Sequence, residues 1–129
     1  MSIEAFPITL RLTNSVQYQA VFDQSDYRIP IGPLLLLARL NHLDLPRIGL
    51  IVSKKVIPLA VQRNRVKRLL RESFRHHLVE VTGLDIIILA RRGLGSLDNK
   101  AVLDTSATLW EKLVAQRDLT ETTQATINK

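Results

Sequence analysis

The spacing of apolar residues along the chain predicts helices and strands in alternation. In TNSVQYQAVFDQ (residues 13–24), apolar side chains recur at i, i+3 and i+4 behind Asn14 and Ser15, which commonly cap helices. LLLLARL (34–40) and RIGLIVSKKV (47–56) are apolar or alternating runs that predict strands. SDYRIPIGP, which lies between the helix and the first of these runs, holds two prolines and is typical of a turn.

The second half of the chain continues the alternation. A helical pattern runs from about residue 60 to 81 and stops at Thr82-Gly83, where glycine suits a left-handed helix end. LDIIILARR (84–92) is short and rich in isoleucine, as in the middle of a sheet, and 97–117 form an amphipathic helix. The polar, threonine-rich residues 118–129 predict a disordered tail after a single domain of residues 1–117.

This order of elements predicts the fold class. Helix, two or three strands, helix, strand and helix give an α/β (α+β) two-layer sandwich, with one sheet of about four strands and helices packed on it. No apolar run reaches the length of a membrane span and no secretory signal is visible, so a cytoplasmic protein is expected. The absence of cysteine excludes disulfides, thiolate catalysis and cysteine-based zinc sites.

The net charge of +6 is concentrated in one stretch. Residues 54–75 hold eight basic side chains and one acid, Glu72, whereas the rest of the chain holds ten basic and eleven acidic residues. On a helical wheel the apolar face surrounds Val66 and the basic side chains form a stripe on the opposite face. The stripe lacks the mixed-sign pairs of a merely solvated face and is mostly arginine, which favours a phosphodiester partner. Charge alone does not separate RNA from DNA.

Intrinsic nuclease chemistry is poorly supported, because it needs clustered carboxylates or paired histidines. The acids are scattered, and His76 and His77 lie 100° apart on the wheel, so they cannot converge on one metal ion. His77 is predicted to pack on the apolar side, and His76 extends the stripe. A helix-turn-helix DNA-binding factor is also disfavoured, because strands are predicted on both sides of the basic helix.

Four segments in order resemble the protein subunit of bacterial ribonuclease P. They are YQAVF (18–22), RIGLIVSKKV (47–56), AVQRNRVKRLLRESFR (60–75) with its Arg-Asn-Arg signature, and DIIILARRG (85–93). The resemblance extends from about Phe6 to Val114. A general RNA-binding protein, of ribosomal type or an RNA chaperone, remains the alternative, since it explains the basic stripe equally well.

The resemblance implies a fold, an activity and partners. The fold has a left-handed βαβ crossover, against the usual right-handed rule. The activity is tRNA processing by an endonuclease, a hydrolase whose catalytic RNA and Mg²⁺ ions remove the 5′ leader of precursor tRNA. The protein subunit then binds both RNAs, has no catalytic or metal-binding side chain, and requires neither a membrane nor a protein partner.

The resemblance also implies two sets of site residues. Those on the catalytic RNA are Arg63, Asn64, Arg65, Lys67, Arg68, Arg71 and Arg75. Those in a cleft for the single-stranded leader are Tyr18, Phe22, Lys54 and Lys55. Two rings at i and i+4 could stack on unpaired bases, although Phe22 fits the core equally well. Tyr18 is expected to face the ligand because its hydroxyl prefers a wet edge. In a regular strand Lys54 and Lys55 would point to opposite faces, so that only one lines the cleft.

The sequence departs from the family pattern in two places. Pro58-Leu59-Ala60 stands where many members have a Gly-x-Ala turn before the signature helix, which leaves the angle of that helix open. Residues 1–10 contain no Lys or Arg, whereas the family often has a basic N-terminal arm. We therefore expect weaker phosphate contacts from this arm.

Overall fold

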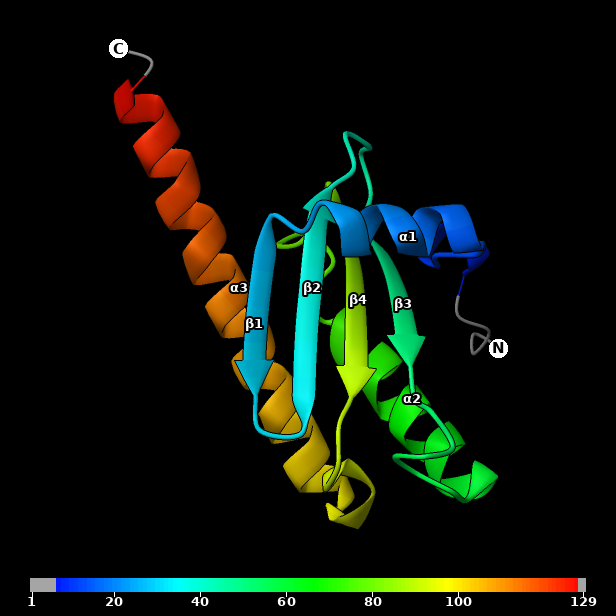
Figure 1. The fold of residues 1–129 in the computed structure, drawn as a ribbon. Helices are drawn as coiled ribbons and strands as arrows, with labels where there is room; N and C mark the ends of the chain where they lie inside the picture. The colour runs from blue at the N-terminus through cyan, green and yellow to red at the C-terminus, as the bar shows by residue number, and fades with distance from the viewer. Residues whose placement is uncertain (1–6, 128–129) are drawn as a thin grey trace.

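One four-stranded mixed sheet forms the centre of the fold (Figure 1). The structure is a computed structural model that describes residues 7–127, with the side chains of these residues except Ile8 and 121–127. Its strands, in the sheet order β1-β2-β4-β3, are β1 (Tyr27–Ile31), β2 (Leu34–Leu40), β4 (Leu84–Ala90) and β3 (Arg47–Ile51). β2 pairs antiparallel with both β1 and β4, whereas β3 and β4 are parallel.

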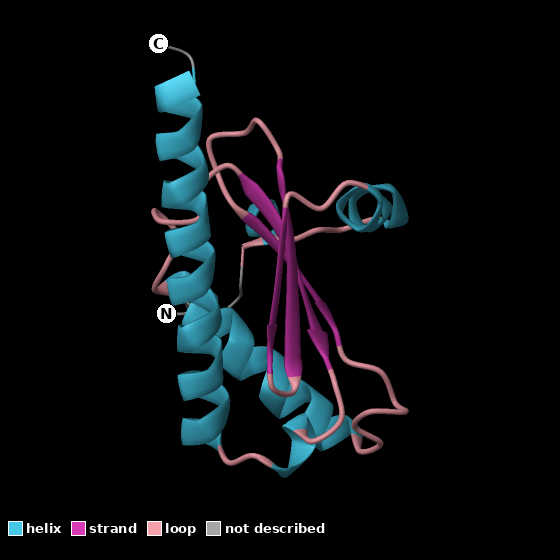
Figure 2. Ribbon diagram, turned by 60° about the vertical axis from the view of Figure 1, so that its left-hand side comes forward, coloured by secondary structure: helices cyan, strands magenta, loops and turns pink. Residues whose placement is uncertain are grey.

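Helices cover the two faces of the sheet unequally. α1 (Ser15–Asp23) crosses one end of one face, while α2 (Ala60–Arg75) and α3 (Asn99–Ile127) lie along the other (Figures 1 and 2). Two short 3-10 helices complete the order, η1 (Ile8–Leu10) and η2 (Leu94–Ser96). The two-layer fold class predicted from the sequence is confirmed. In the described residues no helix is long and apolar enough to cross a membrane.

The connection from β3 through α2 to β4 is left-handed. In Figure 1, β3 and β4 point the same way, β4 lies to the left of β3, and α2 passes behind the sheet. Figure 2, turned by 60°, places α2 on the opposite side of the sheet from α1. This is the crossover that the family resemblance implied, against the general preference for right-handed connections.

Each face of the sheet has its own hydrophobic core. The face under α2 and α3 buries most of the large apolar side chains, among them Leu36, Ile88, Phe74 and Trp110. The face under α1 has a much smaller cluster of buried residues, Leu12, Val21, Leu37 and Ile87. Leu35, Ile51 and Leu89, which pack at the margin of this cluster, are only half-buried.

β1 lies in the stretch that the sequence predicted as a turn. Pro30 sits within the strand and is exposed, opposite Leu35 of β2. β1 is an edge strand, and an edge position tolerates proline because no neighbour on the outer side needs its missing N–H. The turn predicted from the two prolines is therefore wrong for residues 27–31, whereas the predicted order of helices and strands is confirmed.

Three element ends also differ from the prediction. β3 ends at Ile51, so that Lys54 and Lys55 lie in a turn in which the N–H groups of Val56 and Ile57 both donate to Ser53 O. α2 ends at Arg75 rather than near residue 81, because the N–H groups of residues 76 and 77 turn to carbonyls three residues back. α3 continues to Ile127 through the polar residues predicted as a tail, a stretch without glycine or proline. Residues 1–6, 128 and 129 lie outside the described residues.

Candidate nucleic-acid interface

Packing against α3 fixes which face of α2 points outward. Val66, Leu70 and Phe74 are fully buried, as the sequence predicted. Ser73 lies among them, and its Oγ accepts a 2.7 Å hydrogen bond from Trp110 Nε1 and lies 2.8 Å from Ser106 Oγ. These buried polar contacts are directional and therefore fix the rotation of α2 about its axis. His77, predicted to pack, stacks on Trp110 with ring centroids 5.8 Å apart.

The opposite face of α2 presents cationic side chains. Asn64 and Arg68 are exposed, and Lys67, Arg71 and Arg75 are half-buried. Within the described part of the chain, Lys67 and Arg68 make no hydrogen bond or ion pair, and the acids Glu72 and Asp98 do not pair with them. Three ion pairs within the described residues join Arg47 to Asp85, His77 to Glu80, and Lys100 to Asp104. The stripe is therefore open to an external anion along its middle two turns.

The two arginines of the Arg-Asn-Arg run are turned toward the protein. Arg63 Nη1 donates to Ile57 O at 3.0 Å and to Pro58 O at 2.7 Å, in the loop that precedes the helix. Arg65 donates from all three of its nitrogens, including a 2.9 Å bond from Nη2 to Leu97 O. Both side chains are half-buried. The structure thus separates these two from the outward members of the predicted RNA-binding set.

The stripe reaches the α1 side of the molecule at Arg71. Partial burial and the nearby charge of Arg11 lower the pKa of Arg71. The electrostatic interaction with Tyr18 acts in the opposite direction and raises this pKa. Arg71 remains charged at any physiological pH because an arginine titrates far above it. The α2 stripe and the α1 surface are therefore electrostatic neighbours, and an anion near Arg71 would be attracted by Arg11 as well.

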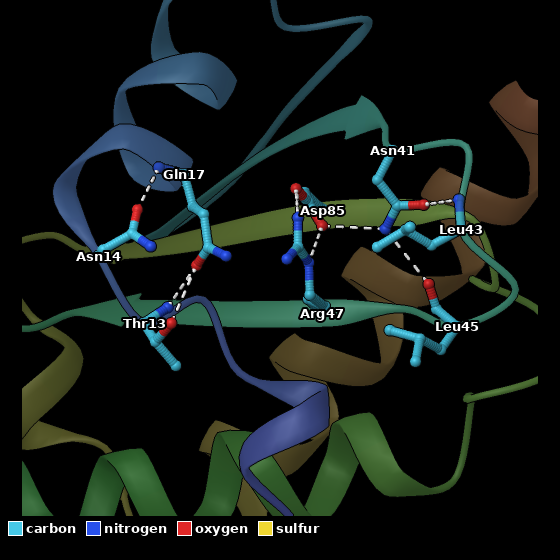
Figure 3. Close-up of polar contacts among 8 residues, drawn as sticks. All are labelled: Thr13, Asn14, Gln17, Asn41, Leu43, Leu45, Arg47 and Asp85. Atoms are coloured by element: carbon cyan, nitrogen blue, oxygen red, sulfur yellow. Dashed lines mark hydrogen bonds and ion pairs between the residues drawn. The ribbon is translucent and has the colours of Figure 1, made fainter.

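α1 brings Tyr18 to the thinly covered face of the sheet and leaves Phe22 exposed. The helix begins as the sequence predicted: Asn14 Oδ1 accepts a 2.9 Å bond from Gln17 N, and Gln17 Oε1 accepts a 2.6 Å bond from Thr13 N (Figure 3). Val21 points into the small core, while Phe22 is 43% exposed and is therefore not a core residue.

Tyr18 lies half-buried over β3. A Cβ at Gly49 would meet Cζ and Oη of Tyr18 at 2.6 Å, so the ring lies directly against the glycine backbone. Only a residue without a side chain permits this approach. Tyr18 is thus held at the junction between α1 and β3, and it packs against the same small apolar cluster as the half-buried Ile51.

A buried polar group lies on this same face and was not predicted. Arg47 and Asp85 are direct partners across β3 and β4, and Arg47 donates from Nε to Oδ1 (2.8 Å) and from Nη2 to Oδ2 (2.7 Å) of Asp85 (Figure 3). Asn41 Nδ2 donates to the same carboxylate at 2.9 Å and also to Leu45 O. The hydrogen bonds that Arg47 donates to the Asp85 carboxylate raise the pKa of Arg47. A lone acid in the apolar run LDIIILA was the sequence signal for this group.

Additional cations gather where the parallel strands end. Lys54 and Lys55 are both exposed in the turn after β3, so they do not alternate as in a regular strand. Arg91 and Arg92 follow β4, whose carboxyl end lies at the same end of the sheet as that of β3. Arg91 N–H donates to Pro33 O, which ties this segment to the turn between β1 and β2. The sequence marked Lys54 and Lys55 but not the two arginines.

The described residues do not fit a protein-held magnesium site. Among them, no three or more His, Asp or Glu side chains lie close enough together to hold an ion. The most buried carboxylate, Asp85, already accepts hydrogen bonds from Arg47 and Asn41. We therefore assign no metal-dependent step to side chains of this chain.

Comparison with known sequences identifies relatives over most of the chain. The family model described as Ribonuclease P matches residues 6–114. A Pseudomonas aeruginosa protein named Ribonuclease P protein component is 49% identical over 111 residues, which cover 86% of this chain and 82% of that protein. A protein of the same name from Stutzerimonas stutzeri is 48% identical over 103 residues, covering 80% of this chain and 79% of that protein.

Solved structures share the fold. The RNase P protein from Staphylococcus aureus superposes with a TM-score of 0.75 at 24% identity, covering 81% of this chain and 94% of that one. The RNase P protein from Thermotoga maritima gives a TM-score of 0.69 at 26% identity, covering 79% and 96%. The likeness to the Staphylococcus aureus protein concerns the fold alone, and the sequence relatives carry the family assignment.

Proposed function

The chain belongs to the ribonuclease P protein family, and we propose that it is the subunit that binds the catalytic RNA and the 5′ leader of precursor tRNA. In this role it assists endonucleolytic removal of the leader, which produces the mature 5′ end of the tRNA. The observation that carries the proposal is the open cationic face of α2, which buried contacts hold beside the thinly covered α1 face of the sheet.

The outward face of α2 is proposed to contact the catalytic RNA. Asn64, Lys67, Arg68 and Arg71 lie on about two turns of helix and have no acidic partner among the described residues. Arginine guanidinium groups bind phosphate oxygens in bidentate geometry, and each neutralised phosphate releases counterions, so affinity should fall steeply with salt. Arg75 extends the stripe toward the end of the helix.

The leader is proposed to lie on the α1 face. Phe22 is exposed and Tyr18 is half-buried, and both belong to the helix that leaves Leu35, Ile51 and Leu89 partly uncovered. Aromatic rings and apolar surface suit unpaired bases, while Lys54 and Lys55 at the end of β3 suit the phosphates between them. The proximity of Arg71 and Tyr18 would place the leader next to the catalytic RNA.

Cleavage itself is proposed to belong to the RNA subunit and its Mg²⁺ ions, which supply the metal-assisted hydrolysis when bound. The contribution of this chain is to bind and orient, since its cations attract and align the two RNA backbones. Its described carboxylates and imidazoles form no group that fits a metal ion.

Reconstitution tests the proposal directly. The purified protein is mixed with ribonuclease P RNA transcribed from the Pseudomonas aeruginosa sequence and with a precursor tRNA, at a Mg²⁺ concentration at which the RNA alone is inactive. We expect the mixture to release the leader and leave the mature 5′ end, while the protein alone releases nothing. Cleavage by the protein alone would refute the proposal. A mixture that stays inactive although the protein binds RNA would favour a general RNA-binding protein instead.

A further inference from the structure

We propose that Arg65 is a positioning residue, which locks the first turns of α2 to the start of α3, and not a phosphate ligand. The inference concerns the surface assigned to the catalytic RNA, and therefore rests on the proposed function. It departs from the expectation that every basic residue of the Arg-Asn-Arg run contacts RNA.

The guanidinium of Arg65 is engaged on every nitrogen. Nε donates to Gln62 Oε1 at 2.8 Å, Nη1 donates to Asn99 Oδ1 at 2.6 Å, and Nη2 donates to Leu97 O at 2.9 Å. Two of these acceptors lie 32 and 34 residues further along the chain, at the junction between η2 and α3. The side chain therefore joins two helices that the sequence places far apart.

The first turn of α2 lacks the usual cap. Leu59 at the N-cap position makes no side-chain hydrogen bond, so the first N–H groups of the helix are without that support. Two arginines tie this turn to the neighbouring loops, although as donors they do not cap its N–H groups: Arg63 donates to the carbonyls of the preceding loop, and Arg65 donates to the loop across from it. Asn64, which lies between them, is exposed.

Arg65 would lose these bonds if it turned to a phosphate. Three of its five N–H groups are committed to these acceptors, so a phosphate that drew the guanidinium outward would replace the bonds to Leu97 O and Asn99 Oδ1 instead of adding to them. Arg68, one turn further along, is exposed and makes no such bond within the described residues. An RNA backbone would therefore gain more from Arg68, and Arg65 would act by keeping Arg68 and Asn64 in place.

The test measures affinity for Pseudomonas aeruginosa ribonuclease P RNA over a series of salt concentrations. Arg65→Ala is expected to weaken binding roughly tenfold, about the effect of one charged hydrogen bond, without changing the slope of log K against log salt. Arg65→Lys should weaken it almost as much, because one ammonium cannot bridge these separate acceptors. Arg68→Ala, the matched reference, should lower the slope by about 0.9.

Asn99→Ala tests the proposal independently, since it removes the Oδ1 acceptor of Arg65 without removing a charge. It is expected to weaken binding by about two- to threefold at constant slope, and to add little on top of Arg65→Ala, because both break the same contact. Circular dichroism first establishes that each variant is folded at the assay temperature. The proposal is overturned if Arg65→Ala lowers the slope as Arg68→Ala does while Arg65→Lys restores it, or if folded Arg65→Ala binds like the wild type. Neither outcome touches the reconstitution result, which tests the function itself.

Discussion

The two faces of the sheet differ in how completely they are covered. Under α2 and α3, Leu36, Ile86 and Ile88 have no exposed surface. On the other face α1 crosses only one end of the strands, and Leu35 and Leu89, next to those residues in sequence, stay half-buried (Figure 1). Neighbouring positions of the same strands thus have different environments, since successive side chains point to opposite faces.

This difference indicates a division of labour. The covered face supplies most of the buried apolar area and therefore most of the stability, and it holds α2 with its cationic side outward. The partly covered face retains apolar and aromatic surface that a partner could cover. Substitutions of the buried apolar side chains on the first face should change the free energy of unfolding, and those of the partly exposed aromatic side chains on the second should mainly change binding.

Trp110→Ala should have the largest effect on stability. The ring is fully buried against α2, stacks on His77 and donates its N–H to Ser73. Its loss leaves a cavity and removes one of the two hydrogen bonds of Ser73 Oγ, and we expect about 3–5 kcal/mol less free energy of unfolding in urea titrations. Val16→Ala, at a residue 76% exposed on α1, is the control and should change it by less than about 0.5 kcal/mol. Equal effects would contradict the division between the faces.

Asp85→Ala tests whether the pair of Arg47 and Asp85 on the α1 face contributes to the free energy of unfolding. The change leaves the guanidinium of Arg47 without its carboxylate, and breaking a buried pair on one side costs about 3–5 kcal/mol. Arg47 keeps 20% of its side chain exposed, so we expect the low end, about 3 kcal/mol. Asp104→Ala is the matched control, because its pair with Lys100 is exposed and should contribute at most about 0.5 kcal/mol. A loss no larger than that of the control would show that the buried pair is dispensable.

The contrast between these residues also shows what the sequence could predict. Val66, Leu70 and Phe74 repeat at helical spacing, so the buried face of α2 follows from local periodicity, as does the cap at Asn14. The pairing of Arg47 with Asp85 requires the register of β3 on β4, which no local pattern contains. The inward turn of Arg65 likewise depends on Leu97, 32 residues away.

The local sequence pattern does not determine how the predicted RNA-binding side chains are placed. A helical wheel places Arg65 on a flank of the stripe, and only the position of the η2–α3 junction decides that its nitrogens are occupied. The apolar run continues past Ile51 and therefore predicts a strand that includes Lys54 and Lys55, whereas the hydrogen bonds to Ser53 O bend the chain there. Long-range and turn contacts thus account for what the pattern missed.

Tyr18→Ala should separate binding from stability on the partly covered face. If the ring stacks on a leader base, its removal costs about 1–3 kcal/mol of affinity for leader-bearing precursor tRNA in the presence of the catalytic RNA. Mature tRNA should bind as before, and Tyr18→Phe, which keeps the ring, should retain the affinity for precursor. An equal loss for precursor and mature tRNA would mean that Tyr18 acts only through the fold.

Gly49→Ala changes the support of that ring without changing the ring itself. The new Cβ would lie 2.6 Å from Tyr18 atoms, so the tyrosine must move away from β3. Because the tip of a side chain can shift more easily than backbone, we expect a stability loss near the low end for overpacking, about 1 kcal/mol. Affinity for the precursor should fall, while that for mature tRNA stays unchanged. Wild-type affinity for precursor would show that the position of the ring over Gly49 does not matter for the leader.

Of these substitutions, Arg68→Ala should change the free energy of unfolding least while still weakening RNA binding. The side chain is exposed on the outward face of α2, so the free energy of unfolding should change by less than about 0.5 kcal/mol. Binding of the catalytic RNA should nevertheless weaken, with a salt slope lower by about 0.9, since one phosphate contact is lost. Lys112→Ala on α3 removes the same charge from an exposed position off the stripe and should leave the slope unchanged. Identical slopes for both variants would mean that net charge, and not the placement of the stripe, attracts the RNA.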